Sequence, residues 1–194
     1  MIITVLIHET GHLIFGLLTG YRPISFKILW IVIEDKEPRI GLRIKAIRPV
    51  GQCLMYPKKA DAFPDKMILG GPLCNLIFGM MFLIIGMTVS GVVLKIIMLY
   101  LTSLGIAIGI YNLFFGSAYS DGKTLLEIKR NKEAGVAYNN LLMIYRYLYI
   151  GRSYADMPES LFTVEQEYAG TIFTELKEHR EMKEKYNGCN GKTV

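Results

Sequence analysis

Charged residues are missing from two long stretches of this 194-residue sequence, Met67–Leu94 and Ile96–Ser120. Each stretch exceeds the roughly 20 apolar residues that cross the hydrocarbon core of a bilayer. Uncharged runs of this length are rare in soluble proteins, where the alternative reading is a buried helical hairpin. We therefore predict two membrane-spanning helices, over residues 68–90 and 96–120.

Cysteine is also scarce. The three cysteines, Cys53, Cys74 and Cys189, are far apart, and no C-x-x-C pair occurs. This spacing argues against a disulfide framework and against a cysteine-based zinc site. Reduced thiols suit polar segments that face the cytoplasm.

Histidine occurs three times, yet two of the three stand in one short run, His8-Glu9-Thr10-Gly11-His12. On a helix, positions i and i+4 share a face, so both imidazoles can reach one metal ion. Glu9 lies beside that position, where its carboxylate can take a proton from a metal-bound water. H-E-x-x-H on a helix is the arrangement of zinc metalloproteases.

The alternative reading of this run is a pair of ordinary core histidines. Its flanks, residues 2–7 and 13–18, are almost entirely apolar. An ionisable side chain at membrane depth is costly and indicates a functional site. We therefore predict a third span over residues 1–20. This segment lacks a basic start and a small-residue cleavage site, so we expect it to be retained rather than removed as a signal peptide.

The distribution of basic residues predicts the orientation. Residues 21–66 carry ten Lys/Arg against five Asp/Glu, and the chain after Asp121 carries eleven against ten. Because basic residues favour the cytoplasmic side, we expect both segments in the cytoplasm. We expect residues 90–95, the turn between the two long spans, on the other side of the membrane. No nucleic-acid-binding motif accompanies these charges, so we expect no nucleic-acid partner.

Residues 24–56 show strand periodicity. Apolar residues alternate over 26–33, a polar turn follows at 34–38, and alternation resumes over 39–46. We predict a β-hairpin, with residues 51–55 as a possible third strand. The open edge of such a sheet could accept an extended peptide, or the sheet could be a structural cap, and the sequence leaves both open.

Two further polar residues fall within the predicted spans. Asn75 lies one turn after Gly70-Gly71-Pro72, where a buried amide needs a partner. The predicted span over residues 96–120 loses its helical character after Asn112, because Gly and Ser accumulate before Asp121-Gly122. Irregular backbone is tolerated in a membrane where it lines a cavity. We therefore expect Asp121 to face inward at this break, where it is the one candidate besides Glu9 for the third ligand of a catalytic zinc site.

The C-terminal part of the chain predicts two helices that are not spans. Residues 138–149 show helical spacing with tyrosines that suit a membrane interface, and residues 165–186 show an apolar stripe among charges. His179 falls in the charged run Lys177–Arg180. We interpret it as part of a solvated helix face rather than as a metal ligand.

Three elements now stand in order: the His8–His12 run, Gly71-Pro72-Leu73-Cys74-Asn75, and Asp121-Gly122. Together they resemble the site-2 protease family of intramembrane zinc metalloproteases, over residues 1 to about 130. The resemblance implies three core transmembrane helices and one zinc ion per chain. It implies that His8, His12 and Asp121 bind the zinc, that Glu9 activates the water, and that Asn75 holds the substrate or the developing oxyanion.

The sequence as a whole predicts a mainly α-helical integral membrane protein, and the resemblance implies a minimal site-2 protease core of the bacterial type. We expect a membrane-embedded metalloprotease core over residues 1–131, with the sheet as an insert, and a helical tail over 132–194 in the cytoplasm or at the membrane interface. The expected partners are the lipid bilayer and a membrane-anchored protein or peptide substrate, hydrolysed at a peptide bond.

Two other functions stand beside this one. The first is a non-catalytic membrane-embedded binding or regulatory module that retains the protease fold, although such a module would not need Glu9. The second is a soluble zinc peptidase with a buried hairpin.

Overall fold

The computed structural model describes residues 1–34, 40–42, 50–59, 62–115, 120–165 and 169–190. The helices and strands, in chain order, are α1 (Ile2–Leu18), β1 (Tyr21–Ile28), β2 (Ile31–Glu34), β3 (Ile40–Leu42), β4 (Gly51–Pro57), α2 (Asp65–Thr88), α3 (Val92–Ile110), α4 (Asp121–Arg130), α5 (Lys132–Tyr149) and α6 (Thr171–Asn190). A π-helical turn, Tyr111–Phe115, extends α3, and two 3-10 turns, Tyr154–Asp156 and Glu159–Phe162, lie between α5 and α6.

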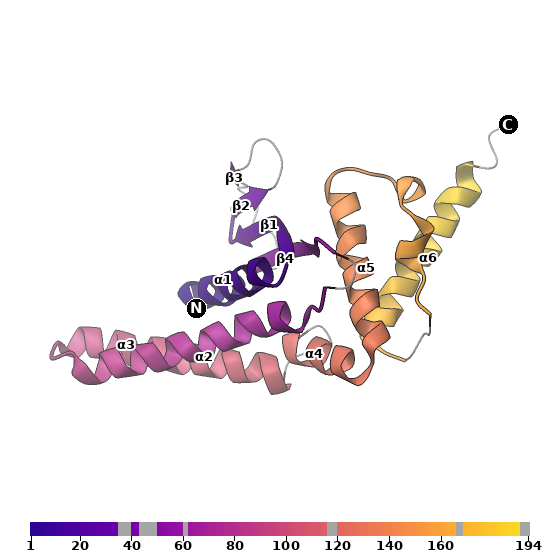
Figure 1. Ribbon diagram of the computed structural model, residues 1–194. Helices are drawn as coiled ribbons and strands as arrows, with labels where there is room; N and C mark the ends of the chain where they lie inside the picture. The colour runs from indigo at the N-terminus through magenta and orange to yellow at the C-terminus, as the bar shows by residue number, and fades with distance from the viewer. Residues whose placement is uncertain (35–39, 43–49, 60–61, 116–119, 166–168, 191–194) are drawn as a thin grey trace.

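Helices α2 and α3 form an antiparallel pair that extends away from the rest of the molecule (Figure 1). Both are long and apolar enough to cross a membrane, as predicted from the uncharged runs. Within their most apolar windows, 33% of α2 and 22% of α3 are buried inside the molecule. Large apolar side chains therefore cover their outer surface, which suits contact with lipid rather than the buried hairpin of a soluble protein.

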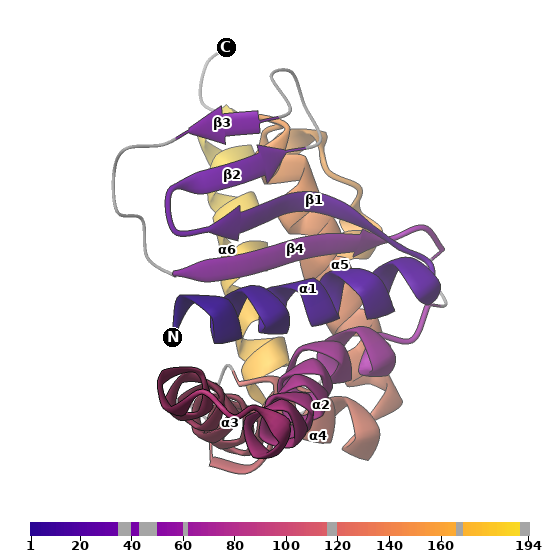
Figure 2. The same cartoon turned by 90° about the vertical axis from the view of Figure 1, so that its left-hand side faces the viewer.

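Helix α1 packs against α2 but does not run along it. Figure 2 views α2 and α3 nearly end-on, whereas α1 lies across the view. Gly11 and Gly70 face each other at the crossing, because a Cβ atom at either position would strike the backbone of the other helix. With 17 residues, α1 is about 25 Å long, less than the roughly 30 Å core of a bilayer. The predicted span over residues 1–20 therefore stays a prediction.

The sheet is antiparallel, with the strand order β3-β2-β1-β4. The prediction of one strand over residues 26–33 is wrong: β1 ends at Ile28, and β2 begins at Ile31 after a two-residue turn. Leu29 has a φ of 54° in this turn, an uncommon backbone conformation for a non-glycine residue. The predicted strand at 51–55 is confirmed as β4, which pairs with β1. Of the predicted strand over 39–46, residues 40–42 form β3, and the others lie outside the described residues.

Helices α5 and α6 lie behind the sheet in Figure 2, where α5 packs on β4 and α6 packs on α5. They share a core with the sheet and with the start of α2. The prediction of helix over 138–149 is confirmed, and α6 forms most of the second predicted helix. The Tyr21 hydroxyl in β1 donates a hydrogen bond to Asn139 Oδ1 in α5 at 2.8 Å. The shared core contains Tyr21, Met55, Met67, Ile68, Ile128, Leu141, Leu142, Ile144, Phe162 and Leu176.

The interpretation of His179 as part of a solvated helix face is wrong. Its side chain is half-buried, and its Nδ1 lies 2.7 Å from the Tyr154 hydroxyl. Its ring packs edge-on against the ring of Tyr145, with centroids 5.4 Å apart. The contact to Tyr154 comes from a 3-10 turn that the periodicity of the helix cannot reveal.

Candidate metal centre

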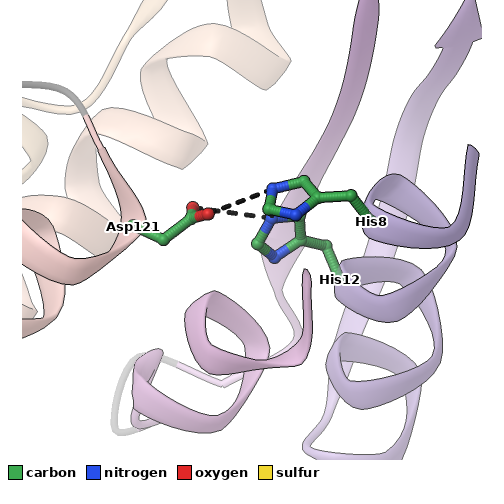
Figure 3. Close-up of side chains that lie close together, drawn as sticks. All are labelled: His8, His12 and Asp121. Atoms are coloured by element: carbon green, nitrogen blue, oxygen red, sulfur yellow. Dashed lines mark hydrogen bonds and ion pairs between the residues drawn. The ribbon is translucent and has the colours of Figure 1, made fainter. Parts of the chain in front are cut away.

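Helix α1 brings His8 and His12 onto the face that looks toward α4 (Figure 3). Their rings are nearly perpendicular, with an interplanar angle of 88° and centroids 4.7 Å apart. Their Nε2 atoms lie 3.2 Å from each other. The i, i+4 spacing therefore does what the sequence predicts: it points two imidazole nitrogens at one position.

Asp121, the first residue of α4, completes the cluster from more than 100 positions further along the chain. Its Oδ2 lies 3.1 Å from His8 Nε2, and its Oδ1 lies 3.5 Å from His12 Nε2. One ligand atom from each of the three residues falls within 4.8 Å of the others. The structure thus brings together His8, His12 and Asp121, three residues that the sequence singles out.

The spacing of these atoms fits zinc. With ligand bonds of about 2.0–2.1 Å, neighbouring ligands of a tetrahedral zinc ion are about 3.3 Å apart. Here the two imidazole Nε2 atoms are 3.2 Å apart, and His8 Nε2 lies 3.1 Å from Asp121 Oδ2. The 3.5 Å separation joins His12 Nε2 to the other carboxylate oxygen, Oδ1. Two imidazoles and a carboxylate are also a common protein ligand set of catalytic zinc sites, which keep a fourth position open.

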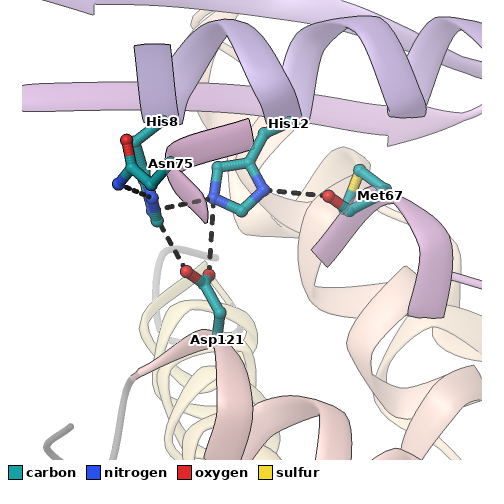
Figure 4. A network of polar contacts seen from close by, with 5 residues as sticks. All are labelled: His8, His12, Met67, Asn75 and Asp121. Atoms are coloured by element: carbon teal, nitrogen blue, oxygen red, sulfur yellow. Dashed lines mark hydrogen bonds and ion pairs between the residues drawn. The ribbon is translucent and has the colours of Figure 1, made fainter. Parts of the chain in front are cut away.

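Buried groups around the cluster fix the orientation of both imidazoles (Figure 4). The Met67 carbonyl lies 2.8 Å from His12 Nδ1 and can only accept, so Nδ1 carries the proton and Nε2 keeps its lone pair. The Asn75 Nδ2 atom lies 3.2 Å from His8 Nδ1. Asn75 is 1% exposed, and its Oδ1 has no hydrogen-bond partner among the described residues.

Small residues let the supporting elements approach the cluster. Gly71 in α2 lies directly beneath the His12 ring, because a Cβ atom there would meet its imidazole. Gly122 packs against the carbonyl of Leu113 in the π-helical turn. The regular helix of α3 ends at this turn, close to the break that the sequence predicts after Asn112, and α4 begins with Asp121.

A cavity of about 570 Å³ opens beside the three residues. Glu9 lines it, together with Cys53 of β4. Burial, with a smaller contribution from Glu9, raises the pKa of the Cys53 thiol to about 12, so this thiol stays protonated. The cavity is lined by Val5, His8, Glu9, His12, Gly51, Gln52, Cys53, Met67, Ile68, Ile108, Asn112, Ser120, Asp121 and Tyr138.

Sequence reasoning missed two contributors to this site. The Met67 carbonyl is a backbone group, and no residue type marks it. Tyr138 belongs to α5, and its phenol faces the cavity from the C-terminal part of the chain. Its place on the apolar stripe of that helix was visible in the sequence, but its proximity to Asp121 was not. Burial, with Asp121 as the next cause, raises the Tyr138 pKa above its usual value and keeps the phenol protonated.

A His-Glu-x-x-His helix whose imidazoles meet a distant carboxylate, beside two membrane-length helices, is what a membrane-embedded metallopeptidase requires. The chain matches the family model described as peptidase family M50 over residues 1–185, and it belongs to this family, the site-2 protease family. M50 members are intramembrane metallopeptidases that use zinc. The match extends beyond residue 130, so it includes α5 and most of α6. No curated protein and no solved structure matches the chain.

Proposed function

We propose that the chain is an intramembrane zinc metalloendopeptidase that hydrolyses a peptide bond of a membrane-anchored protein or peptide. The observation that carries this proposal is the convergence of His8, His12 and Asp121 at zinc-ligand spacing, with Glu9 on the wall of the same cavity. One zinc ion per chain would be held by these three side chains.

When bound there, zinc supplies Lewis-acid chemistry: it lowers the pKa of a coordinated water toward 7 and polarises the scissile carbonyl. Glu9 acts as the general base that takes the proton from the attacking water and then passes it to the leaving amine. Cys53 of β4 lies beside Glu9 on the wall of this cavity.

The substrate would be held extended beside β4. A helical peptide bond is shielded, so a transmembrane substrate must unwind before water can attack it. β4 is an edge strand of the sheet, and its first residues, Gly51 to Cys53, line the cavity next to Glu9. Backbone pairing with this short stretch would place an extended peptide across the metal centre.

Asn75 would orient His8. A half-turn of the Asn75 amide places Oδ1 against His8 Nδ1, where it accepts a hydrogen bond. This arrangement satisfies an oxygen that is otherwise buried without a partner. It also leaves His8 Nε2 with the lone pair that a ligand needs. A direct role of Asn75 in holding the oxyanion, as the family resemblance implies, stays a prediction.

The same elements support a proposal for the membrane placement. We propose a multi-pass protein of the cell membrane in which α2 and α3 span the bilayer with α1 inserted beside them. The sheet, α5 and α6 then lie on the cytoplasmic side.

Zinc analysis and a cleavage assay together test the proposal. We expect one zinc per wild-type chain, loss of zinc in His8→Ala, His12→Ala and Asp121→Ala, and full zinc without cleavage in Glu9→Gln. Asn75→Ala should weaken zinc binding by about 10- to 100-fold. Thr102→Val is the matched control, because Thr102 is a buried polar side chain that bonds its own helix at the Met98 carbonyl.

The non-catalytic module is the second candidate, and Glu9 separates it from the protease. If Glu9→Gln processes membrane-anchored proteins as wild type does, Glu9 is not the base. If wild type binds no zinc, or Asp121→Ala binds zinc as well as wild type, the ligand assignment is wrong.

A further inference from the structure

A second cavity, of about 320 Å³, adjoins the metal centre on the side of the C-terminal helices. It shares Gln52, Ile68, Asp121 and Tyr138 with the first cavity, so Asp121 and Tyr138 stand between the two. One face of α5 and one face of α6 form its far wall. Its lining consists of Gln52, Leu54, Ile68, Asp121, Thr124, Tyr138, Leu141, Leu142, Tyr145, Thr171, Ile172 and Glu175.

The walls of this second cavity are largely apolar, but its far end carries a negative charge. Glu175 and Asp121 are the charged side chains among the described residues that line it. Asp121 faces the two imidazoles, which leaves Glu175 as the carboxylate directed at the cavity from α6. Among the described residues, no lysine or arginine forms an ion pair with Glu175.

Tyr145 holds Glu175 in place. Its hydroxyl donates a hydrogen bond to the Glu175 carboxylate. Burial is the main cause that raises the pKa of Tyr145 above its usual value, and Glu175 raises it further, so Tyr145 remains a neutral donor. Glu175 itself is half-buried. A half-buried carboxylate with one neutral donor still has acceptor capacity for a cation.

We infer that this second cavity is a specificity subsite that binds a lysine or arginine side chain of the substrate next to the scissile bond. The inference rests on the proposed peptidase function. A basic side chain combines a long apolar stem with a cationic end. The stem would pack on Ile68, Leu142 and Ile172, and the cation would reach Glu175.

The expected substrates supply such a residue at the right place. The second cavity is lined by residues of α5 and α6. These helices lie at the end of the α2–α3 pair opposite the turn between α2 and α3 (Figure 1). In the proposed orientation this is the cytoplasmic side. Lysine and arginine are concentrated in the cytoplasmic residues that flank transmembrane segments. A membrane-anchored substrate cleaved near that boundary would therefore present a basic side chain to Glu175.

Binding of peptide hydroxamates to the zinc-loaded protein in detergent tests this inference without a known substrate. The hydroxamate chelates zinc, and the side chain at each of the two positions nearest to it is varied among lysine, norleucine and glutamate. Norleucine is the matched control, since it keeps the stem and lacks the charge. We expect the lysine compound to bind about tenfold more tightly than the norleucine compound at one position, with the glutamate compound weakest, as measured by titration calorimetry.

Variants of α6 then assign the preference to Glu175. Glu175→Gln keeps an acceptor for Tyr145 and should abolish the lysine preference, and Glu175→Lys should reverse it in favour of glutamate. Glu178→Gln is the control, because Glu178 is an exposed carboxylate on the same helix that does not line the cavity. Equal binding of the lysine and norleucine compounds at both positions, or a preference that survives Glu175→Gln, would overturn the inference.

The two proposals fail in different ways. A protein that holds zinc and binds every hydroxamate equally retains the proposed function and loses the subsite. A protein that holds no zinc loses the proposed function, and the subsite with it. A protein that binds zinc but none of the hydroxamates also overturns the subsite. In that case a peptide at the zinc does not reach the second cavity.

Discussion

Three histidines in this chain owe their environments to partners that are distant in sequence. His12 takes its tautomer from the Met67 carbonyl, and His8 lies against Asn75. His179 is hydrogen-bonded to the Tyr154 hydroxyl and packs against Tyr145. A fixed hydrogen-bond partner on one ring nitrogen helps to set the tautomer of a buried imidazole. For His8 and His12 the result is a pair of candidate ligands, and for His179 it is a half-buried ring between α5 and α6.

His179 makes the stability of this C-terminal unit depend on pH. Burial lowers the His179 pKa, and this effect outweighs the opposing influence of Glu175 and Glu178. An unfolded histidine titrates near pH 6.5, so below that pH the unfolded state binds more protons than the folded state. The stability that His179 contributes is present above about pH 6.5 and is lost as the pH falls toward its folded pKa. Hydrogen exchange tests this for the α5 and α6 amides of the wild type. Their protection factors, which correct for the intrinsic pH dependence of exchange, should be lower at pH 5.5 than at pH 7.5.

The variant His179→Gln should remove much of that dependence. Glutamine can still accept a hydrogen bond from Tyr154, but it does not titrate. Lys177→Gln, an exposed position on the same helix, should behave as wild type. If the protection factors at pH 5.5 fall equally in His179→Gln and in the wild type, another group causes the loss.

At the level of single residues, sequence reasoning reached the side chains of the site but not the backbone carbonyl that orients His12. The i, i+4 spacing of His8 and His12 follows from helix geometry alone. Asp121 required the family resemblance and its place at a break in a span. The Met67 carbonyl carries no residue-specific signal, and it becomes visible when α2 is placed beside α1. The burial of His179 was missed for a similar reason.

At the level of helices and strands, the sequence predicts the elements that have a clear local pattern of apolar residues. It does not predict the boundary that depends on the turn between β1 and β2. The uncharged runs identified α2 and α3, and the Gly- and Ser-rich stretch identified the interruption before α4. The alternation over residues 26–33 continued through Leu29 and Trp30 because neither residue has the turn chemistry of Gly or Asn. The hairpin of β1 and β2 was therefore read as one strand.

The close packing of α2 against α1 predicts that a larger residue at Gly71 is destabilising. In Gly71→Ala, the new methyl group would meet the His12 ring, and the helix or the imidazole must move. We expect about 1–3 kcal/mol of lost stability, as is typical of overpacking. We also expect at least about tenfold weaker zinc binding, since small shifts of a ligand's support have such effects. Thermal unfolding and a competitive chelator titration measure the two quantities.

The control for this variant is Gly91→Ala, in the turn between α2 and α3. Its new Cβ atom would have its nearest neighbour at 4.0 Å, so both quantities should stay at the wild-type level. Wild-type zinc affinity in Gly71→Ala would mean that the contact between α2 and His12 does not position the ligand.

For the whole molecule, the placement of charge and the exposed apolar surface give the same orientation. Apolar side chains are exposed along α1, α2 and α3, including Leu17, Ile84, Val93 and Phe114. The sheet, α5 and α6 share one core at the opposite end from the α2–α3 turn, so we expect them on one side of the membrane. Basic residues are numerous in these parts and nearly missing from the turn, where Lys95 is the nearest. By the positive-inside rule, we expect this side to face the cytoplasm.

Cysteine labelling in intact cells tests this orientation at three exposed positions. In a variant whose own three cysteines are replaced by serine, Ser90→Cys in the α2–α3 turn should react with a membrane-impermeant maleimide. Lys58→Cys after β4 and Arg152→Cys after α5 should react after permeabilisation and not before. The shared core makes the last two positions inseparable, because Tyr21 and Asn139 join the sheet to α5. Labelling of Lys58→Cys and Arg152→Cys on opposite sides would therefore contradict the fold itself, whereas a full reversal would contradict the orientation and leave the fold intact.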